Sequence, residues 1–196
     1  MKRLFLTFGF IITILMAFAD SPLTSTPFHT AYEGVAEVKA AVSANGELNI
    51  DLMEFLSSKN PIAYKMAIIN AIGWAFEGHN NYDRYKSFLG EKTGKGKLKA
   101  ENLLCLAYLK ALDNYFDCVD ALKIADEALA LNPKSYTFNI IHALIKAQVL
   151  FDTDWCALYQ ATDNVRKRPD LKSDMNDGAI YIIFDYMDLY KTECGK

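Results

Sequence analysis

Apolar side chains recur at steps of three and four residues along most of the chain, a spacing that places them on one face of an α-helix. The pattern is most regular in Asp120–Pro133, where alanine, leucine and isoleucine form one face and Asp120, Lys123, Asp126 and Glu127 take much of the other. This segment therefore predicts an amphipathic helix that buries its apolar face against neighbouring helices.

A stripe of small residues marks the same helix. Ala121, Ala125 and Ala128 lie along one line of its surface, and small side chains let a second helix approach to about 8 Å between axes. Asn132 is followed by Pro133, and proline disfavours the helical conformation in the residue before it. Because another apolar helix follows directly, the segment is typical of the second half of a stacked helical hairpin.

The rest of the chain gives the same helical period with hardly any alternation at period two, so we expect an all-α protein. Asn176 or Asp177 is expected to cap the last helix, and Pro61 suits the first turn of the helix that it opens. The further predicted helices cover Tyr32–Val42, Leu48–Ser57, Ile62–Glu77, Tyr82–Gly90, Phe138–Leu150, Asp154–Arg166 and Asn176–Tyr190.

The first residues have the pattern of a secretory signal peptide. Lys2 and Arg3 precede an apolar run, which ends in an A-x-A-like site before Asp20, so cleavage is expected after Ala19 and the protein is expected to be exported to the periplasm or outside the cell. The alternative is an uncleaved membrane anchor, but the run is shorter than the roughly 20 residues that span a bilayer. After cleavage no membrane insertion is expected.

Residues 20–46 are predicted to form a spacer that contains a possible short helix. Ser21–Thr30 holds two prolines and many hydroxyl side chains, a composition that predicts a mobile connection. Asn45 and Gly46 form a predicted turn, and residues 47–196 have a comfortable length for a single helical domain.

The central helices resemble the tetratricopeptide repeat, whose unit of about 34 residues is two antiparallel helices with small residues at fixed places in the second. A unit that runs over Asn102–Ser135 places Ala121, Ala128 and Pro133 on signature positions of the family. Weaker matches extend the resemblance over roughly Pro61–Pro169. The resemblance implies a short α-α superhelix of about three hairpins with extra flanking helices.

In the family, the first helices of the hairpins line a concave groove that binds peptides. Carried over by position, Trp74 and Lys110 become the leading candidates, an aromatic anchor beside a charge; the alternative is that Trp74 and Leu144 belong to the core. The positions that the resemblance assigns to the groove are Asn70, Trp74, Glu77, Leu106, Lys110, Asp113, Asn114, Thr137, Ile140, Leu144 and Gln148.

The charge argues against two classes of partner. The whole chain has a formal net charge of −3, and loss of Lys2 and Arg3 with a signal peptide would make it −5. A mildly acidic protein is a poor candidate for binding nucleic acid or an anionic membrane surface.

Candidate chemistry in the sequence is weak, and no catalytic residue, metal site or cofactor is predicted. Gly90–Gly96 has too few residues between its glycines for a phosphate-binding loop. Asp174–Gly178 lacks the bidentate glutamate of a calcium loop, and helix capping explains it better. His29, His79 and His142 do not form a pair with metal-ligand spacing.

Four cysteines leave the disulfide pattern open. Cys105 and Cys118 are expected too far apart to pair, and buried free thiols are the prediction for both of them and for Cys156. Cys118 and Cys156 lie near the starts of successive second helices and could approach one another. Cys194 can pair only if the C-terminal tail folds back.

Three functions remain compatible with the sequence. An exported, non-catalytic binding or scaffold module with a protein or peptide partner is the preferred one. The second is a structural subunit of an oligomeric envelope or secreted assembly. The third is an enzyme of helical fold that uses acidic side chains.

Overall fold

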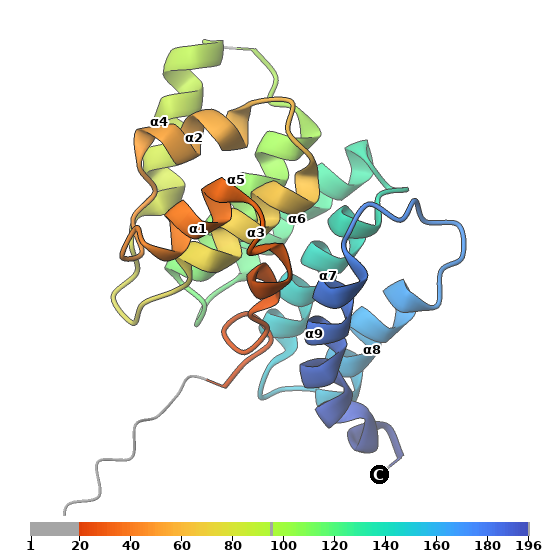
Figure 1. The fold of residues 1–196 in the computed structure, drawn as a ribbon. Helices are drawn as coiled ribbons and strands as arrows, with labels where there is room; N and C mark the ends of the chain where they lie inside the picture. Colours follow the sequence, from red (N-terminus) through yellow and green to blue (C-terminus); the bar gives the residue numbers. More distant parts are fainter. Residues whose placement is uncertain (1–19, 95, 196) are drawn as a thin grey trace, which may run out of the picture.

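A computed structural model describes residues 20–94 and 96–195, so the predicted signal peptide lies outside the described residues. The described chain is mainly helical and its residues form no β-sheet (Figure 1), which confirms the predicted all-α class. Its helices are the 3-10 helix η1 (Phe28–Tyr32), α1 (Ala36–Val42), α2 (Ile50–Ser57), α3 (Ile62–Ile72), α4 (Asn81–Thr93), α5 (Ala100–Asp113), α6 (Val119–Leu131), α7 (Tyr136–Leu150), α8 (Trp155–Arg166), α9 (Asp177–Met187) and the 3-10 helix η2 (Asp188–Gly195).

Helix α6 forms as its sequence pattern predicts. Its alanines Ala121, Ala125 and Ala128 are fully buried, and Asn132 caps the helix one residue before Pro133. The small stripe allows α6 to pack closely between α5 and α7, the two helices with which it makes its main contacts.

The second half of the chain contains two helical hairpins. Helix α5 packs along α6, and α7 packs along α8, each pair joined by a short loop. The first half is arranged differently, because α3 packs mainly on α1 and η1 while α4 packs on α5. Nothing in this arrangement identifies the tetratricopeptide repeat, which stays a resemblance of sequence.

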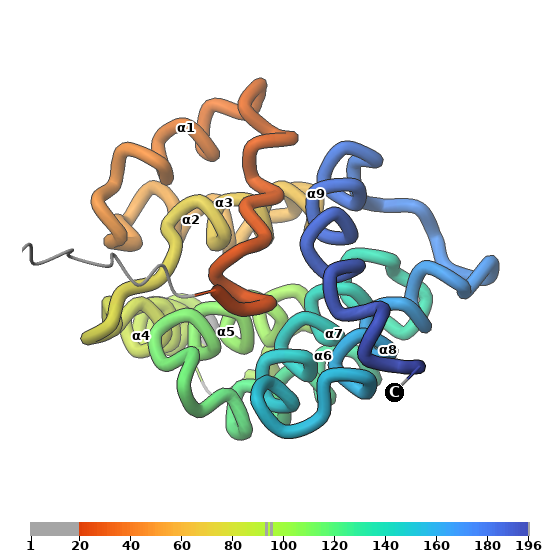
Figure 2. Tube along the Cα trace, turned by 90° about the horizontal axis from the view of Figure 1, so that it is seen from below, coloured from red at the N-terminus to blue at the C-terminus, as the bar shows by residue number. Residues whose placement is uncertain are grey.

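The N-terminal segment is part of the folded body, and the expectation of a mobile spacer over Ser21–Thr30 is wrong. Leu23, Thr26 and Phe28 are at most 2 % exposed. The segment lies between α3 and α9 (Figure 2), and η1 contacts both of these helices. Its prolines and hydroxyl residues therefore shape a packed, irregular strap across the helices.

Helix α3 ends five residues earlier than the apolar pattern predicts. Gly73 adopts φ 75, a left-handed conformation that glycine reaches without steric cost and that terminates a helix. The chain therefore leaves the helix before Trp74 and Phe76, which belong to the following loop.

The C-terminal tail folds back onto α8 and corrects the prediction for one cysteine. Cys156 is not a free thiol but forms a disulfide with Cys194, whereas Cys105 and Cys118 are buried free thiols as expected. Because the disulfide takes Cys156, it excludes the Cys118–Cys156 pairing that the sequence left open.

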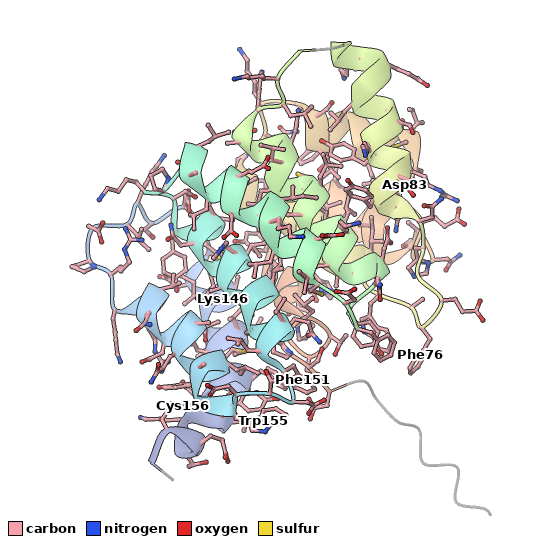
Figure 3. All side chains as sticks on the ribbon, turned by 180° about the vertical axis from the view of Figure 1, so that it is seen from behind. Phe76, Asp83, Lys146, Phe151, Trp155 and Cys156 are labelled. Carbon is pink, nitrogen blue, oxygen red and sulfur yellow. A yellow bond between two sulfur atoms is a disulfide. The ribbon has the colours of Figure 1, made fainter. Side chains whose placement is uncertain are left out.

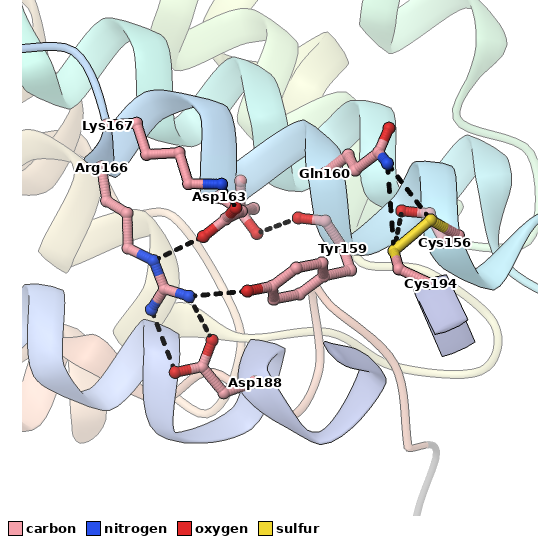
Figure 4. A network of polar contacts seen from close by, with 9 residues as sticks. Cys156, Tyr159, Gln160, Asp163, Arg166, Lys167, Asp188 and Cys194 are labelled. Carbon is pink, nitrogen blue, oxygen red and sulfur yellow. Dashed lines mark hydrogen bonds and ion pairs between the residues drawn. A yellow bond between two sulfur atoms is a disulfide. The ribbon is translucent and has the colours of Figure 1, made fainter. Parts of the chain in front are cut away.

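A network of charges fixes the same tail (Figure 4). The Arg166 guanidinium donates two hydrogen bonds to the Asp188 carboxylate, at 2.6 and 3.0 Å, and a third to Asp163 at 2.7 Å. Its guanidinium also lies 4.3 Å from the centre of the Phe184 ring. Two-point arginine–carboxylate contacts combine charge with fixed geometry, so α9 and η2 are held in register against α8.

Candidate functional site

Most of the groove positions that the resemblance assigns are buried in the structure. Trp74, Lys110 and Asp113 are half-buried, and Glu77 and Asn114 are exposed. The buried positions are Asn70, Leu106, Thr137, Ile140, Leu144 and Gln148, each at most 9 % exposed. A face made of these residues is part of the interior, and it offers no open groove to a peptide in this conformation.

The N-terminal segment occupies one end of this face through Asn70. The Asn70 side-chain oxygen accepts the His29 backbone N–H at 3.0 Å, and its amide nitrogen donates to the Thr26 carbonyl at 3.1 Å. The same amide nitrogen donates to the Tyr108 hydroxyl at 3.0 Å, and the Tyr108 ring stacks with Phe28. Asn70 is thus a buried connector between α3, α5 and the N-terminal segment.

The chain also covers predicted groove positions at both ends of α7. The Gln148 side-chain oxygen accepts the Leu23 backbone N–H at 3.4 Å. Asp174 accepts the Thr137 backbone N–H at 2.8 Å and the Ser135 hydroxyl at 2.5 Å. Asp174 therefore helps to cap the start of α7, which the sequence did not predict. The predicted cap of the last helix is confirmed at Asn176, whose side-chain oxygen accepts the Gly178 backbone N–H at 2.7 Å.

Two charged groove candidates have partners of their own. The Asp113 carboxylate accepts the backbone N–H of Tyr82 at 2.7 Å, which satisfies a donor at the start of α4. The Lys110 ammonium lies 4.7 Å from the centre of the Tyr82 ring. Lys110 and Asp113 therefore both contact Tyr82 at the start of α4.

An open pocket of about 300 Å³ lies next to the covered face, where α3, α5 and α7 end. The loops that follow these helices supply most of its wall, and the start of the N-terminal segment and the last turn of α7 supply the rest. Figure 3 shows Phe76 and Phe151 at this end of the molecule. The lining residues are Asp20, Ser21, Phe76, Tyr115, Phe116, Gln148, Phe151 and Asp152. Gln148 is the one position that the sequence prediction shares with this pocket.

Aromatic rings form one side of the pocket. Tyr115 is 6 % exposed and anchors the group, with its ring centre 4.9 Å from Trp74 and 4.2 Å from Phe116. Phe76 contacts Trp74 at 5.3 Å and Phe116 at 6.3 Å between ring centres. Yet Phe76 is 65 % exposed and Phe116 is 70 % exposed. The cluster therefore presents two supported phenyl rings to solvent.

Local backbone geometry holds this aromatic cluster in place. Gly78, at φ 71, lies so close to α5 that a Cβ there would be 2.4 Å from the Asp113 carbonyl oxygen. Only glycine fits this position, since it combines a left-handed conformation with backbone contact. The loop that carries Phe76 is thereby pressed against the end of α5, beside Tyr115 and Phe116.

The pocket lining also carries two acidic side chains. Asp20 and Asp152 line it, both are exposed, and neither forms an ion pair with a basic side chain of the described chain. Asp152 adopts φ 63, a conformation that is uncommon for any residue but glycine. The C-terminal ends of three helices carry partial negative charge as well. The pocket thus combines aromatic faces with a negative potential.

The two free cysteines are buried. Burial raises the pKa of the Cys105 and Cys118 thiols to about 12, so both stay protonated at neutral pH and are poor nucleophiles. Among residues 20–94 and 96–195, no three His, Cys, Asp or Glu side chains are grouped so as to hold a metal ion.

No known protein family, curated protein or solved structure matches this chain. Within the described part of the chain, no helix is both long enough and apolar enough to cross a bilayer.

Sequence reasoning missed most of the pocket. Its helix pattern placed Trp74 and Phe76 inside a helix, and it gave no role to Tyr115, Phe116 or Phe151. A usable signal is present, because an aromatic residue stands shortly after the end of each of α3, α5 and α7. Side chains at equivalent ends of neighbouring helices lie near one another once the helices stack.

Proposed function

We propose that this protein is a non-catalytic binding module, whose protein or peptide partner docks at the pocket bounded by Phe76, Phe116 and Phe151. One observation carries the proposal. Phe76 and Phe116 are 65 % and 70 % exposed, although both contact the buried ring of Tyr115. Large aromatic side chains that are held rigidly at a surface are typical of the residues that dominate binding energy in protein interfaces.

The location of the site differs from the one that the resemblance implies. The face of the first helices is filled by residues 21–32, so the proposed site is the rim where these helices end. Binding there leaves the interior undisturbed, and it avoids the energetic cost of displacing the buried N-terminal segment.

We also propose that the protein works outside the cytoplasm. Met1–Ala19 has the pattern of a signal peptide, and the Cys156–Cys194 disulfide is a bond that persists mainly in oxidising compartments. The N-terminal sequence pattern and the disulfide therefore support export independently of each other.

Site-specific photocrosslinking tests the binding proposal. A photoreactive phenylalanine analogue replaces Phe76 or Phe116 in the expressing cells, and matched controls carry it at Leu131 or Tyr181, which are 62 % and 71 % exposed but lie outside the pocket. The proposal expects one discrete adduct from both pocket positions and none from the controls. The same adduct from all four positions, or none from any, contradicts the proposed site.

The mass of the adduct separates the proposal from its alternative. An adduct of a single protein of different mass supports a binding module. An adduct of twice the mass of this chain indicates self-association, and the structural subunit then replaces the binding module as the better account.

A further inference from the structure

We infer that the pocket accepts a lysine or arginine side chain of the partner, flanked by apolar residues that rest on Phe76 and Phe116. This inference rests on the proposed function and names the chemistry of its partner. It follows from three properties of the pocket, which are its aromatic surface, its charge and its shape.

The aromatic surface suits a cation. The faces of phenyl and indole rings carry a negative quadrupole and attract ammonium and guanidinium groups within about 6 Å of the ring centre. The Phe76 and Phe116 rings are mostly exposed, so a ligand reaches them. The protein already uses such contacts elsewhere, at Lys110 over Tyr82 and at Arg166 over Phe184.

The charged side chains that line the pocket have one sign, and their two carboxylates outweigh the single α-ammonium group that cleavage after Ala19 would place on Asp20. Asp20 and Asp152 are its charged lining residues, and no lysine, arginine or histidine lines it among the residues described. The backbone carbonyls at the ends of α3, α5 and α7 add partial negative charge in the same region. These carboxylates and carbonyls repel an anionic ligand and attract a cation.

The shape of the site favours a peptide over a free amine. A cavity of about 300 Å³ takes one long side chain, and the two exposed phenyl rings extend its apolar surface at the rim. A free amine would leave that surface uncovered, while the residues beside a lysine or arginine in a peptide would cover it. The acidic net charge of −3 is complementary to a basic partner as a whole.

Three synthetic peptides test the inference on the purified protein. They have the sequence Ac-Gly-Leu-Xaa-Leu-Gly-amide with Lys, Gln or Glu at Xaa, so they differ in charge at one position. Binding is followed by the indole N–H signal of Trp74 in two-dimensional NMR spectra. The chain has two tryptophans, and a Trp155→Phe sample assigns the second signal.

The inference predicts that the Lys peptide binds about fivefold to tenfold tighter than the Gln peptide, and that the Glu peptide binds most weakly. A double variant, Asp20→Asn with Asp152→Asn, is expected to abolish the preference for Lys over Gln. The matched control is Asp83→Asn with Asp185→Asn, which makes the same change in charge at exposed sites outside the pocket lining; Figure 3 shows Asp83 on α4, away from Phe76.

Each other outcome has a definite meaning. Equal binding of all three peptides, with loss in a Phe76→Ser plus Phe116→Ser variant, overturns the cationic ligand and leaves the proposed site intact. An equal loss of the Lys preference in the control variant overturns it too, because the charge would then act at long range. If no peptide shifts the Trp74 signal up to about 1 mM, the inference is wrong, and photocrosslinking decides separately whether the proposed function survives.

Discussion

Asn70 and His29 are joined by two contacts, from the His29 backbone N–H to the Asn70 oxygen at 3.0 Å and from the His29 ring nitrogen Nδ1 to the same oxygen at 2.8 Å. The pair fastens the N-terminal segment to the buried face of α3. In a stack of helical hairpins, the first helices form a face that can bind a peptide. The Asn70–His29 contacts help to explain why the N-terminal segment covers that face in this protein. A side chain that the sequence places in a groove is instead a fastening point of the fold.

An Asn70→Ala variant tests this fastening. The change removes the hydrogen bonds to His29 and Thr26 and leaves buried backbone groups without partners, so the free energy of unfolding is expected to fall by about 2–3 kcal/mol. Urea denaturation followed by circular dichroism measures it. Asn164→Ala, at an exposed position of α8, is the control and should change stability by less than about 0.5 kcal/mol. Equal effects of the two changes would contradict the role of Asn70.

The disulfide is expected to stabilise the fold through the C-terminal tail. Cys156 and Cys194 are separated by 38 residues, and a cross-link of this span typically contributes about 2–4 kcal/mol. Urea denaturation of a Cys194→Ser variant should show a loss of this size. Thiol titration in denaturant gives the control, because the two free cysteines, Cys105 and Cys118, should react before reduction and four after it. Four reactive thiols without reductant would contradict the assignment.

Alkaline pH is expected to destabilise the protein through its buried thiols. Burial raises the pKa of Cys105 and Cys118 from 9.0 to about 12. Between these two values the unfolded chain loses the thiol protons while the folded chain keeps them, so ionisation favours unfolding. The contribution of each protonated thiol to the free energy of unfolding is therefore fully present below pH 9. As the pH rises toward 12, the free energy of unfolding falls by up to about 1.4 kcal/mol per pH unit for each thiol.

Two variants check the source of that pH dependence. Urea denaturation at pH 8, 9.5 and 11 should show a shallower loss of stability for Cys118→Ala than for the unchanged protein. Cys194→Ser removes a cysteine that does not titrate in the oxidised fold, and it should leave the alkaline loss at least as steep. An unchanged slope in Cys118→Ala would contradict the contribution of that thiol.

Asp174 gives a prediction about the loop before α9. Its carboxylate accepts hydrogen bonds from Ser135 and Thr137 at the start of α7, so Asp174→Ala is expected to cost about 1–2 kcal/mol of stability. Asp177→Ala is the matched change nearby, and it should cost less because Asp177 is exposed. If added calcium raised the melting temperature of the unchanged protein and not of Asp174→Ala, the segment would be a metal loop and not a cap.

Local sequence signals predict the helices well because the periodic apolar face and the stop residues lie within each helix. The alanine stripe and Asn132 before Pro133 define α6 without any knowledge of its neighbours. By contrast, Gly73 ends α3 through its own left-handed conformation, and the continuing apolar pattern hides this end. Helix period is thus a better guide to the existence of a helix than to its last residue.

The irregular segments are buried by contacts with residues far away in the sequence, and the local composition does not reveal such contacts. Leu23 and Phe28 lie in a segment of prolines and hydroxyl residues that reads as a loop, and they are buried because α3, α5 and α7 offer an apolar face. The pairing of Cys156 with Cys194 likewise requires η2 to fold back onto α8. The pocket was missed for the same reason, since loops far apart in sequence meet there.

The central claim is that a partner binds at the rim while residues 21–32 stay seated on the face of the first helices. Amide hydrogen exchange, with and without the crosslinked partner or the Lys peptide, tests it most directly. The account predicts slower exchange in the loops that carry Phe76 and Phe116, with no faster exchange anywhere in residues 21–32. Faster exchange in residues 21–32 on binding would show that the ligand displaces this segment, and it would place recognition in the face that Asn70 and Gln148 line.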